Sequence, residues 1–153
     1  MDWADAYVLD ASVAVKWHLP DEDLLVPAWQ LVRQFGRGEF ALFAPEQIRY
    51  EVPNAIPVAV QRRPARLTTE EGQSAVAEFL SLQITTFSDT ALLTDAYSFA
   101  LQYGCAFYDA FYLALALRTN RPLVTADRRP YQHIGSLPLV IWLGNWPADA
   151  TGR

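Results

Sequence analysis

The sequence predicts one α/β domain across residues 1–153, with a mainly parallel sheet covered by helices on both faces. Short apolar runs alternate along the chain with longer segments of helical composition. Strands that are buried on both faces appear as such continuous apolar runs, and parallel strands need a helical crossover between them. A length of 153 residues suffices for one domain with its own core, and no repeat, low-complexity run or linker divides it.

Five strands are expected from apolar and β-branched runs at residues 7–9, 40–43, 83–87, 123–125 and 139–142. Helices are expected at residues 11–17, 21–35, from 45 past 51, 68–82, 88–103, 106–118 and 128–133. The fourth of these helices has a clear start signal, because Thr68 is followed three residues later by Glu71, the pattern of a capping box.

The second and third helices carry further local signals. The acidic residues 21–23 suit the positive N-terminal end of the second helix, and Gly36 is expected to end it. Pro45 fits the first position of the third helix, where its missing N–H has no intrahelical partner to lose. Pro53 and Pro57 lie further along this helix and are expected to bend or interrupt it.

The charge pattern limits how the chain can meet nucleic acid. A net charge of −5 argues against coating nucleic acid by bulk electrostatics, although divalent cations bound to carboxylates would reverse the local sign. All basic residues except Lys16 are arginines, and several lie in groups at residues 62–66, 118–121 and 128–129. Arginine suits phosphate contacts, while a solvated helix end explains each group equally well. Arg128 and Arg129, beside Asp127, are the candidates for holding substrate phosphates.

Composition also bears on compartment and partners. The longest apolar runs, at residues 110–117 and 137–143, are too short to cross a bilayer, and the acidic N-terminus is unlike a signal peptide. The single cysteine, Cys105, fits a reducing compartment and is expected to be a buried core residue. These features predict a cytoplasmic protein without a membrane partner. Five Trp, seven Tyr and eight Phe favour a protein partner, because surplus aromatic residues gather at interfaces.

Asp109 is the most informative acidic residue. It is the only charged side chain between Gly104 and Leu117. A helix that is apolar on all sides is buried, and burying an unpaired carboxylate is costly. Asp109 therefore requires a cation, hydrogen-bond donors or a raised pKa, with a salt bridge to a buried arginine as the structural alternative. Its place inside the apolar run argues against a helix cap.

Three further carboxylates share this ambiguity when each is taken alone. Asp10 and Asp127 follow strands, at the sheet edge where α/β folds bind ligands. Each also suits the cap of the helix that follows it, a role that Ser12 could fill as well. Glu51 lies among apolar neighbours and is expected to be partly buried. Their joint placement predicts that all three converge with Asp109.

Converging carboxylates indicate a definite chemistry. Several carboxylates held within a few ångströms cannot all stay ionised without a cation. Oxygen ligands with no histidine nearby favour Mg²⁺ or Mn²⁺ over Zn²⁺. One or two such ions activate a water molecule and stabilise the charge that develops during in-line displacement at a phosphodiester. Metal-dependent phosphodiester hydrolysis is therefore the expected reaction.

Four segments carry these acids along the chain. They are Val8–Val13 (VLDASV), Tyr50–Ile56 (YEVPNAI), Tyr108–Ala116 (YDAFYLALA) and Leu123–Asp127 (LVTAD). In order and spacing they closely resemble the signatures of the PIN-domain family, particularly its VapC-type toxin ribonucleases. The resemblance extends over about residues 7 to 142, and the third segment is its most specific part.

The resemblance implies an α/β/α sandwich around a five-stranded parallel sheet, and an Mg²⁺- or Mn²⁺-dependent endoribonuclease that hydrolyses RNA. It implies that the metal ligands and catalytic acids are Asp10, Glu51, Asp109 and Asp127. It places the hydroxyls of Ser12 and Thr125 beside the metal. It also implies a homodimer, and an antitoxin whose C-terminal segment covers the active-site groove.

Other functions remain open at this point. An aspartate-nucleophile phosphotransferase of the haloacid-dehalogenase pattern would need a second Asp two residues after Asp10, where this chain has Ser12. No dinucleotide loop, P-loop or G-x-S-x-G elbow is present. A non-catalytic PIN-like module that binds RNA or protein, and another metal-dependent phosphoesterase, are the alternatives. The intact carboxylates argue against the binding module, because a protein that only holds phosphates would gain by losing them.

Overall fold

The computed structural model describes residues 5–146 and contains a five-stranded sheet in which every pair of neighbours is parallel. The strands are β1 (Ala6–Leu9), β2 (Ala41–Pro45), β3 (Thr85–Phe87), β4 (Leu123–Thr125) and β5 (Val140–Trp142). Their order is β3-β2-β1-β4-β5. The chain builds outward from β1 to β3 and then returns to the other side of β1. Such a reversal opens a ligand-binding crevice at the carboxyl ends of the two central strands, here β1 and β4.

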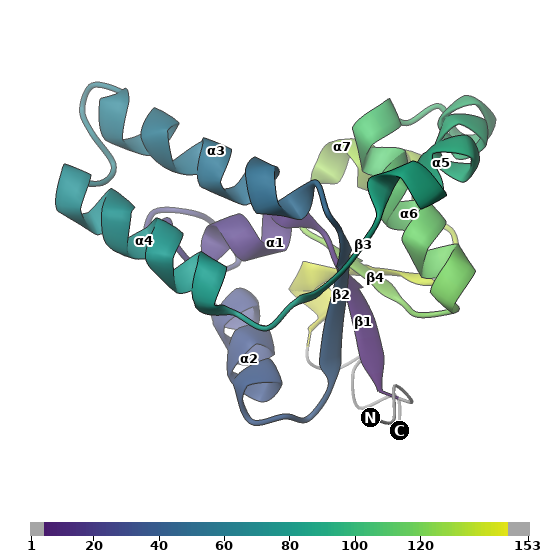
Figure 1. Cartoon of the computed structure of the whole chain (residues 1–153), viewed down its shortest axis with the longest axis horizontal. Helices are drawn as coiled ribbons and strands as arrows, with labels where there is room; N and C mark the ends of the chain where they lie inside the picture. The colour runs from purple at the N-terminus through teal and green to yellow at the C-terminus, as the bar shows by residue number, and fades with distance from the viewer. Residues whose placement is uncertain (1–4, 147–153) are drawn as a thin grey trace.

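Helices cover both faces of the sheet, as predicted (Figure 1). They are α1 (Ala11–Lys16), α2 (Leu25–Gly36), α3 (Ile48–Gln61), α4 (Thr69–Ser81), α5 (Asp89–Tyr103), α6 (Phe107–Thr119) and α7 (Arg128–Ile134). A short 3-10 turn, η1 (Leu143–Asn145), follows β5. In Figure 1, α1 to α4 lie on one side of the sheet, and α5 and α6 on the other. The expected α/β/α sandwich is therefore confirmed.

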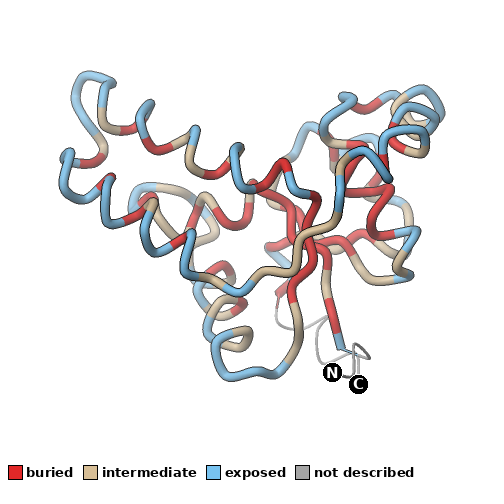
Figure 2. The backbone as a smooth tube through the Cα atoms, in the orientation of Figure 1, coloured by how far each residue is buried: buried red, intermediate tan, exposed pale blue. Residues whose placement is uncertain are grey.

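The core centres on α6. Seven consecutive residues of this helix, Ala110–Ala116, are buried, and they form part of the continuous red segment beside the sheet in Figure 2. The helix contacts β1, β2 and β4 on one side and packs along α5 on the other. The prediction of a helix that is apolar on all sides and buried is confirmed for this stretch.

Helix α2 begins later than the sequence predicted. Its first residue is Leu25, and its first turn holds no acidic residue. The acidic residues that precede it are held by cations from other segments instead. Lys16 Nζ donates to Asp23 Oδ1 at 2.6 Å, and Arg66 Nε donates to both carboxylate oxygens of Asp21. These ion pairs fix the loop before α2, so the expected helix start was wrong.

Pro45 ends a strand and does not start a helix. It is the last residue of β2 and lies opposite Phe87 of β3, and α3 begins only at Ile48. The next ladder bond comes from the amide of Glu46, which donates to the Phe87 carbonyl at 2.9 Å. Pairing with β3 therefore extends the strand past the position that local helix signals favoured.

Helix α3 continues through both of its internal prolines. Pro53 and Pro57 lie inside an unbroken helix, so the expected interruption does not occur. The carbonyls that lose an N–H partner belong to Arg49 and Pro53, and neither residue is buried. Water satisfies such carbonyls at little cost. The apolar residues on the other face, Val52, Ile56 and Ala59, stay buried and hold the helix in place.

Several smaller expectations are met. Thr68 and Glu71 form the capping box at the start of α4, and Cys105 is a buried, free thiol. Helices α3 and α4 form an antiparallel hairpin that extends away from the sheet in Figure 1. Within residues 5–146, no helix has the length and apolar character needed to span a bilayer.

Candidate active site

Asp10 lies at the carboxyl end of β1 and is buried, with 7% of its surface exposed. It occupies the N-cap position of α1, yet its side chain makes no capping hydrogen bond. The carboxylate is used elsewhere, because its Oδ2 accepts hydrogen bonds from Ser12 Oγ and from Thr125 Oγ1, the latter at 3.0 Å. The structural alternative for Asp10, a helix cap, is therefore not realised.

Ser12 and Thr125 join β1 and β4 at this edge of the sheet. The Ala126 amide donates to Ser12 Oγ at 3.0 Å, and the Asp127 amide donates to Thr125 Oγ1 at 3.2 Å. Each hydroxyl thus accepts from the β4 end and donates to Asp10. The two hydroxyls expected beside the acidic cluster hold its most buried member in a fixed orientation.

Asp127 follows β4 and caps α7. Its Oδ1 accepts a hydrogen bond from the Arg129 amide at 3.0 Å, as the capping interpretation predicted. The same residue lies close enough to Asp10 and to Asp109 to raise the pKa of each. Asp127 therefore combines a structural role with a place in the acidic cluster.

Glu51 reaches the cluster from α3 and is half-buried. Tyr112 OH, from the buried helix α6, donates to Glu51 Oε1 at 3.2 Å. Gln47, one helical turn before Glu51, donates from its side chain to the Tyr108 carbonyl at 2.8 Å. These two contacts tie the start of α3 to the start of α6, which brings Glu51 beside Asp109.

Asp109 lies in the first turn of α6, before the fully buried stretch begins. It is half-buried, whereas the apolar run around it predicted that it would lie on a fully buried helix. The difference arises because the residues before Asp109 form the loop and the first turn of the helix. The N-terminal end of a helix favours a negative charge and so lowers the pKa of a carboxyl there. In Asp109 this effect is smaller than the rise in pKa caused by burial and by the neighbouring acids.

The four carboxylates influence one another electrostatically. Burial, followed by the charge of Asp10, raises the pKa of Glu51 to about 7 and that of Asp109 to about 6. Burial also raises the pKa of Asp10, against the lowering effect of its two hydroxyl donors. Carboxylates that raise one another's pKa in this way form one cluster of like charge, in which ionisation is unfavourable without a cation.

This donor set agrees in kind with a hard divalent cation. All four side chains offer carboxylate oxygens, and the raised pKa values show negative charge that lacks compensation. Within residues 5–146, no three or more acidic, histidine or cysteine side chains are arranged so that they could hold a metal ion. Asp10 and Glu51 are each engaged by hydroxyl donors instead.

The two neighbouring arginines differ in their surroundings. Arg129 lies near Asp109 and partly offsets the rise in the pKa of that carboxyl. Arg128 has its guanidinium carbon 5.7 Å from the centre of the Trp142 ring and lies near enough to Asp23 to help lower the pKa of that carboxyl. Of the two arginines proposed from the sequence, Arg129 is the one that lowers the pKa of Asp109.

Sequence reasoning missed the supporting roles of Tyr112 and Gln47. Tyr112 lies three residues after Asp109 and Gln47 four residues before Glu51, so each shares a helix face with its acid. That spacing was the available signal. It does not reveal that each side chain reaches across to the other helix, because this depends on how α3 and α6 pack.

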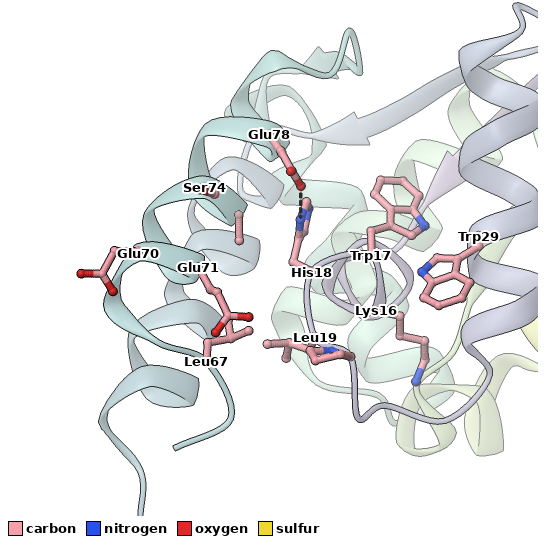
Figure 3. Close-up of a pocket in the computed structure, with 12 residues that line it drawn as sticks. Lys16, Trp17, His18, Leu19, Trp29, Leu67, Glu70, Glu71, Ser74 and Glu78 are labelled. Carbon is pink, nitrogen blue, oxygen red and sulfur yellow. Dashed lines mark ion pairs between the residues drawn. The ribbon is translucent and has the colours of Figure 1, made fainter. Parts of the chain in front are cut away.

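A separate pocket of about 430 Å³ lies between α1, α2 and α4, and none of the four acids lines it (Figure 3). Trp17 and Trp29 contribute apolar surface, and glutamates of α4 form the opposite wall. His18 is directed toward Glu78, with its Nδ1 3.8 Å from Glu78 Oε2. Only 3% of the His18 side chain is exposed, and neither ring nitrogen has a hydrogen-bond partner among the described residues.

The chain is similar to known proteins over most of its length. Ribonuclease VapC12 from Mycobacterium tuberculosis is 35% identical over 128 residues, which cover 84% of this chain and 92% of the relative. The crystal structure of PAE2754 from Pyrobaculum aerophilum has a TM-score of 0.69 at 22% identity, and the match covers 98% of this chain and 92% of the PAE2754 chain. VapBC2 from Rickettsia felis, crystallised with a DNA fragment from its promoter, has a TM-score of 0.59 at 19% identity, and the match covers 90% of this chain and 96% of the Rickettsia chain.

The last two similarities establish the shared fold, and the family follows from two sequence matches. Residues 7–136 match the family model described as PIN domain, a range that contains all four acids. The mycobacterial relative adds 35% identity across most of the chain. The chain therefore belongs to the PIN domain family.

Proposed function

We propose that this chain is a divalent-metal-dependent endoribonuclease that hydrolyses RNA phosphodiester bonds, and that it is the toxin of a VapBC-type toxin–antitoxin pair. The observation that carries the proposal is the cluster of four carboxylates at the carboxyl ends of β1 and β4, held by Ser12, Thr125 and Tyr112. The similarity to a ribonuclease of the VapC type supports RNA as the substrate.

Mg²⁺ or Mn²⁺ is the proposed cofactor, held by Asp10, Glu51, Asp109 and Asp127. When bound, such an ion lowers the pKa of a water molecule and offsets the negative charge that develops on the phosphate. The hard oxygen donors favour these ions, and the nearest histidines take no part in the cluster.

The chain's own residues have distinct tasks in this proposal. Ser12 and Thr125 orient the Asp10 carboxylate, and Tyr112 orients Glu51. Burial of Asp10 excludes water from one side of the cluster, which strengthens the interaction between its carboxylates and a cation. A raised pKa on Glu51 and on Asp109 means that both must lose their protons before they bind the ion.

An antitoxin and a second copy of the chain are the proposed protein partners. The pocket shown in Figure 3 combines tryptophan surfaces with an acidic wall on α4, which suits an apolar segment that carries Arg or Lys. Helix α1 begins beside Asp10 and ends at Lys16, which lines that pocket. Six helical residues span roughly 9 Å, so one extended segment from an antitoxin would reach from the pocket to the acids.

The remaining proposals concern the dimer and the compartment. Three residues of α5 at helical spacing, Leu93, Tyr97 and Leu101, expose large apolar side chains that a second copy would cover. The cytoplasm is the proposed compartment, in keeping with the free thiol of Cys105.

The decisive test uses purified protein freed of any partner and labelled total RNA. Discrete fragments are expected with Mg²⁺ or Mn²⁺, and none with EDTA or with the Asp10→Ala variant. Parallel reactions with single-stranded DNA and with phosphomonoesters distinguish a ribonuclease from a general phosphoesterase. Folded protein that binds RNA but leaves it intact under every metal would support the non-catalytic module instead.

The difference between the two arginines yields a prediction. Arg129→Ala is expected to weaken RNA binding about three- to tenfold at low salt and to reduce the salt dependence of log Kd by about one unit, as loss of one phosphate contact does. Arg128→Ala is the matched control and should change the Kd less than twofold, because its guanidinium packs on Trp142. Equal losses in both variants, measured by a salt titration of RNA binding, would contradict this assignment.

A further inference from the structure

Two exposed tyrosines precede two of the four acids. Tyr50 comes directly before Glu51 on α3, and Tyr108 directly before Asp109 on α6. Their exposed fractions are 76% and 68%. Among the large apolar side chains that the structure describes as exposed, Tyr50 has the highest exposed fraction. Both tyrosines are therefore largely exposed, and each is the sequence neighbour of a proposed metal ligand.

A single glutamine links the two tyrosines. The Tyr50 amide donates to the Gln47 carbonyl at 3.0 Å, and Gln47 Nε2 donates to the Tyr108 carbonyl at 2.8 Å, across 61 residues of sequence. Gln47 is itself buried. The first turns of α3 and α6 are thus fixed side by side, with one exposed tyrosine on each.

The two rings are supported differently. Tyr108 packs on Phe111 with ring centres 6.3 Å apart and planes inclined by 21°, and it also contacts Phe107. These two aromatic residues therefore support the Tyr108 ring, and the rest of its surface is exposed. Tyr50 makes no side-chain hydrogen bond or ring contact with any residue from 5 to 146. Much of the surface of each tyrosine is therefore available to a ligand.

We propose that Tyr50 and Tyr108 stack against unpaired bases on either side of the phosphate that is cut, so that the substrate is single-stranded RNA at this point. This inference rests on the proposed ribonuclease function. Stacking suits an acidic protein, because it needs no positive charge, and here the net charge is −5 with a carboxylate cluster at the site. Bases in an intact duplex are stacked on one another and do not present their faces to such rings.

The test measures binding of a short fluorescein-labelled single-stranded RNA by anisotropy, in an Asp109→Asn background that leaves the RNA intact. Tyr50→Ala and Tyr108→Ala are each expected to raise the Kd about tenfold, the usual effect of removing one aromatic platform. Tyr50→Phe and Tyr108→Phe retain the ring and should bind within about twofold of the parent. The control is Leu80→Ala, which removes a side chain of 63% exposure from α4, away from the proposed stacking site, and should bind within about twofold of the parent.

Two further measurements separate stacking from a general loss of affinity. The alanine variants should leave the salt dependence of log Kd unchanged, since no phosphate contact is removed. An RNA with abasic positions in place of the flanking bases should bind the parent about tenfold more weakly, yet lose little more in the alanine variants. Such non-additivity shows that ring and base interact directly.

The outcomes are distinguishable. If wild-type protein cleaves RNA but the alanine variants bind it with the parent Kd, the tyrosines have no role in substrate binding and this inference alone is wrong. If the alanine substitutions change only the oligomeric state, measured by light scattering, the rings belong to a protein interface and the inference is also wrong. If wild-type protein neither binds nor cleaves RNA, the proposed function fails first.

Discussion

The Asp109→Asn variant is expected to lose RNA cleavage and, in the absence of metal, to be more stable than the wild type at pH 8. The amide lacks the negative charge with which a carboxylate would hold a cation, so the rate should fall at least about a hundredfold, a modest loss for a catalytic group. The amide also removes one negative charge from a cluster in which burial and Asp10 raise the pKa of Asp109 to about 6.

The gain in stability follows from the pKa. A rise from 3.8 to about 6 corresponds nominally to roughly 3 kcal/mol at pH 8. Asp109 is only half-buried, so solvent screening reduces this figure to about 1–2 kcal/mol. For a chain of this length, the gain should raise the melting temperature by about 2–8 °C.

Thermal unfolding in EDTA at pH 8 measures this difference directly. Asp95→Asn is the matched control, since it makes the same chemical change on α5, outside the cluster of four acids, and should shift the melting temperature by no more than about 2 °C. A less stable Asp109→Asn protein would show that the carboxylate is a structural ion-pair partner. Retained cleavage would remove Asp109 from the proposed ligands.

The fold was predictable because its main signals are local. Each buried strand is a short apolar run, and α6 is apolar on all sides from Ala110 to Ala116. The hydrophobic pattern alone therefore predicts the strands of the sheet and the helix buried against it. The errors fall where distant segments decide the outcome. Arg66 reaches Asp21 across 45 residues, and Phe87 of β3 extends the strand through Pro45. No local propensity contains that information.

The site was predictable in outline for a related reason. Parallel strands align their carboxyl ends, so Asp10 and Asp127 had to lie at the same edge of the sheet. The choice between cap and cluster was not predictable. Asp127 caps α7, whereas Asp10 does not cap α1, because Ser12 and Thr125 engage its carboxylate. That difference depends on β4 lying beside β1.

The metal-free protein is expected to lose stability as the pH rises from about 5 to 8, and divalent cations are expected to reverse this trend. In the folded protein the pKa of Glu51 is raised from 4.5 to about 7 and that of Asp109 from 3.8 to about 6, mainly by burial. Between the unfolded and folded values the native state holds more protons than the unfolded chain, so the free energy of unfolding falls with pH.

The magnitude and the effect of metal follow from the same cluster. The two groups interact and are half-buried, so their joint contribution is about 2–4 kcal/mol between pH 5 and 8, less than the nominal sum. A cation binds the deprotonated carboxylates, and so its stabilising effect grows over the same range. At a free concentration of a hundred times the Kd it adds about 2.7 kcal/mol.

A comparison of wild type with the Glu51→Gln/Asp109→Asn double variant isolates this effect. The pKa of His18 is lowered, mainly by burial against a smaller opposing effect of Glu78, so this group makes stability rise with pH. It is present in both proteins and cancels in the difference. Chemical unfolding in EDTA should show a pH-dependent gap that widens toward pH 8, and Mg²⁺ or Mn²⁺ should stabilise only the wild type. A gap that does not change with pH would mean that these two acids do not share a charge cluster. Equal stabilisation of both proteins by the cation would mean that they do not hold the metal.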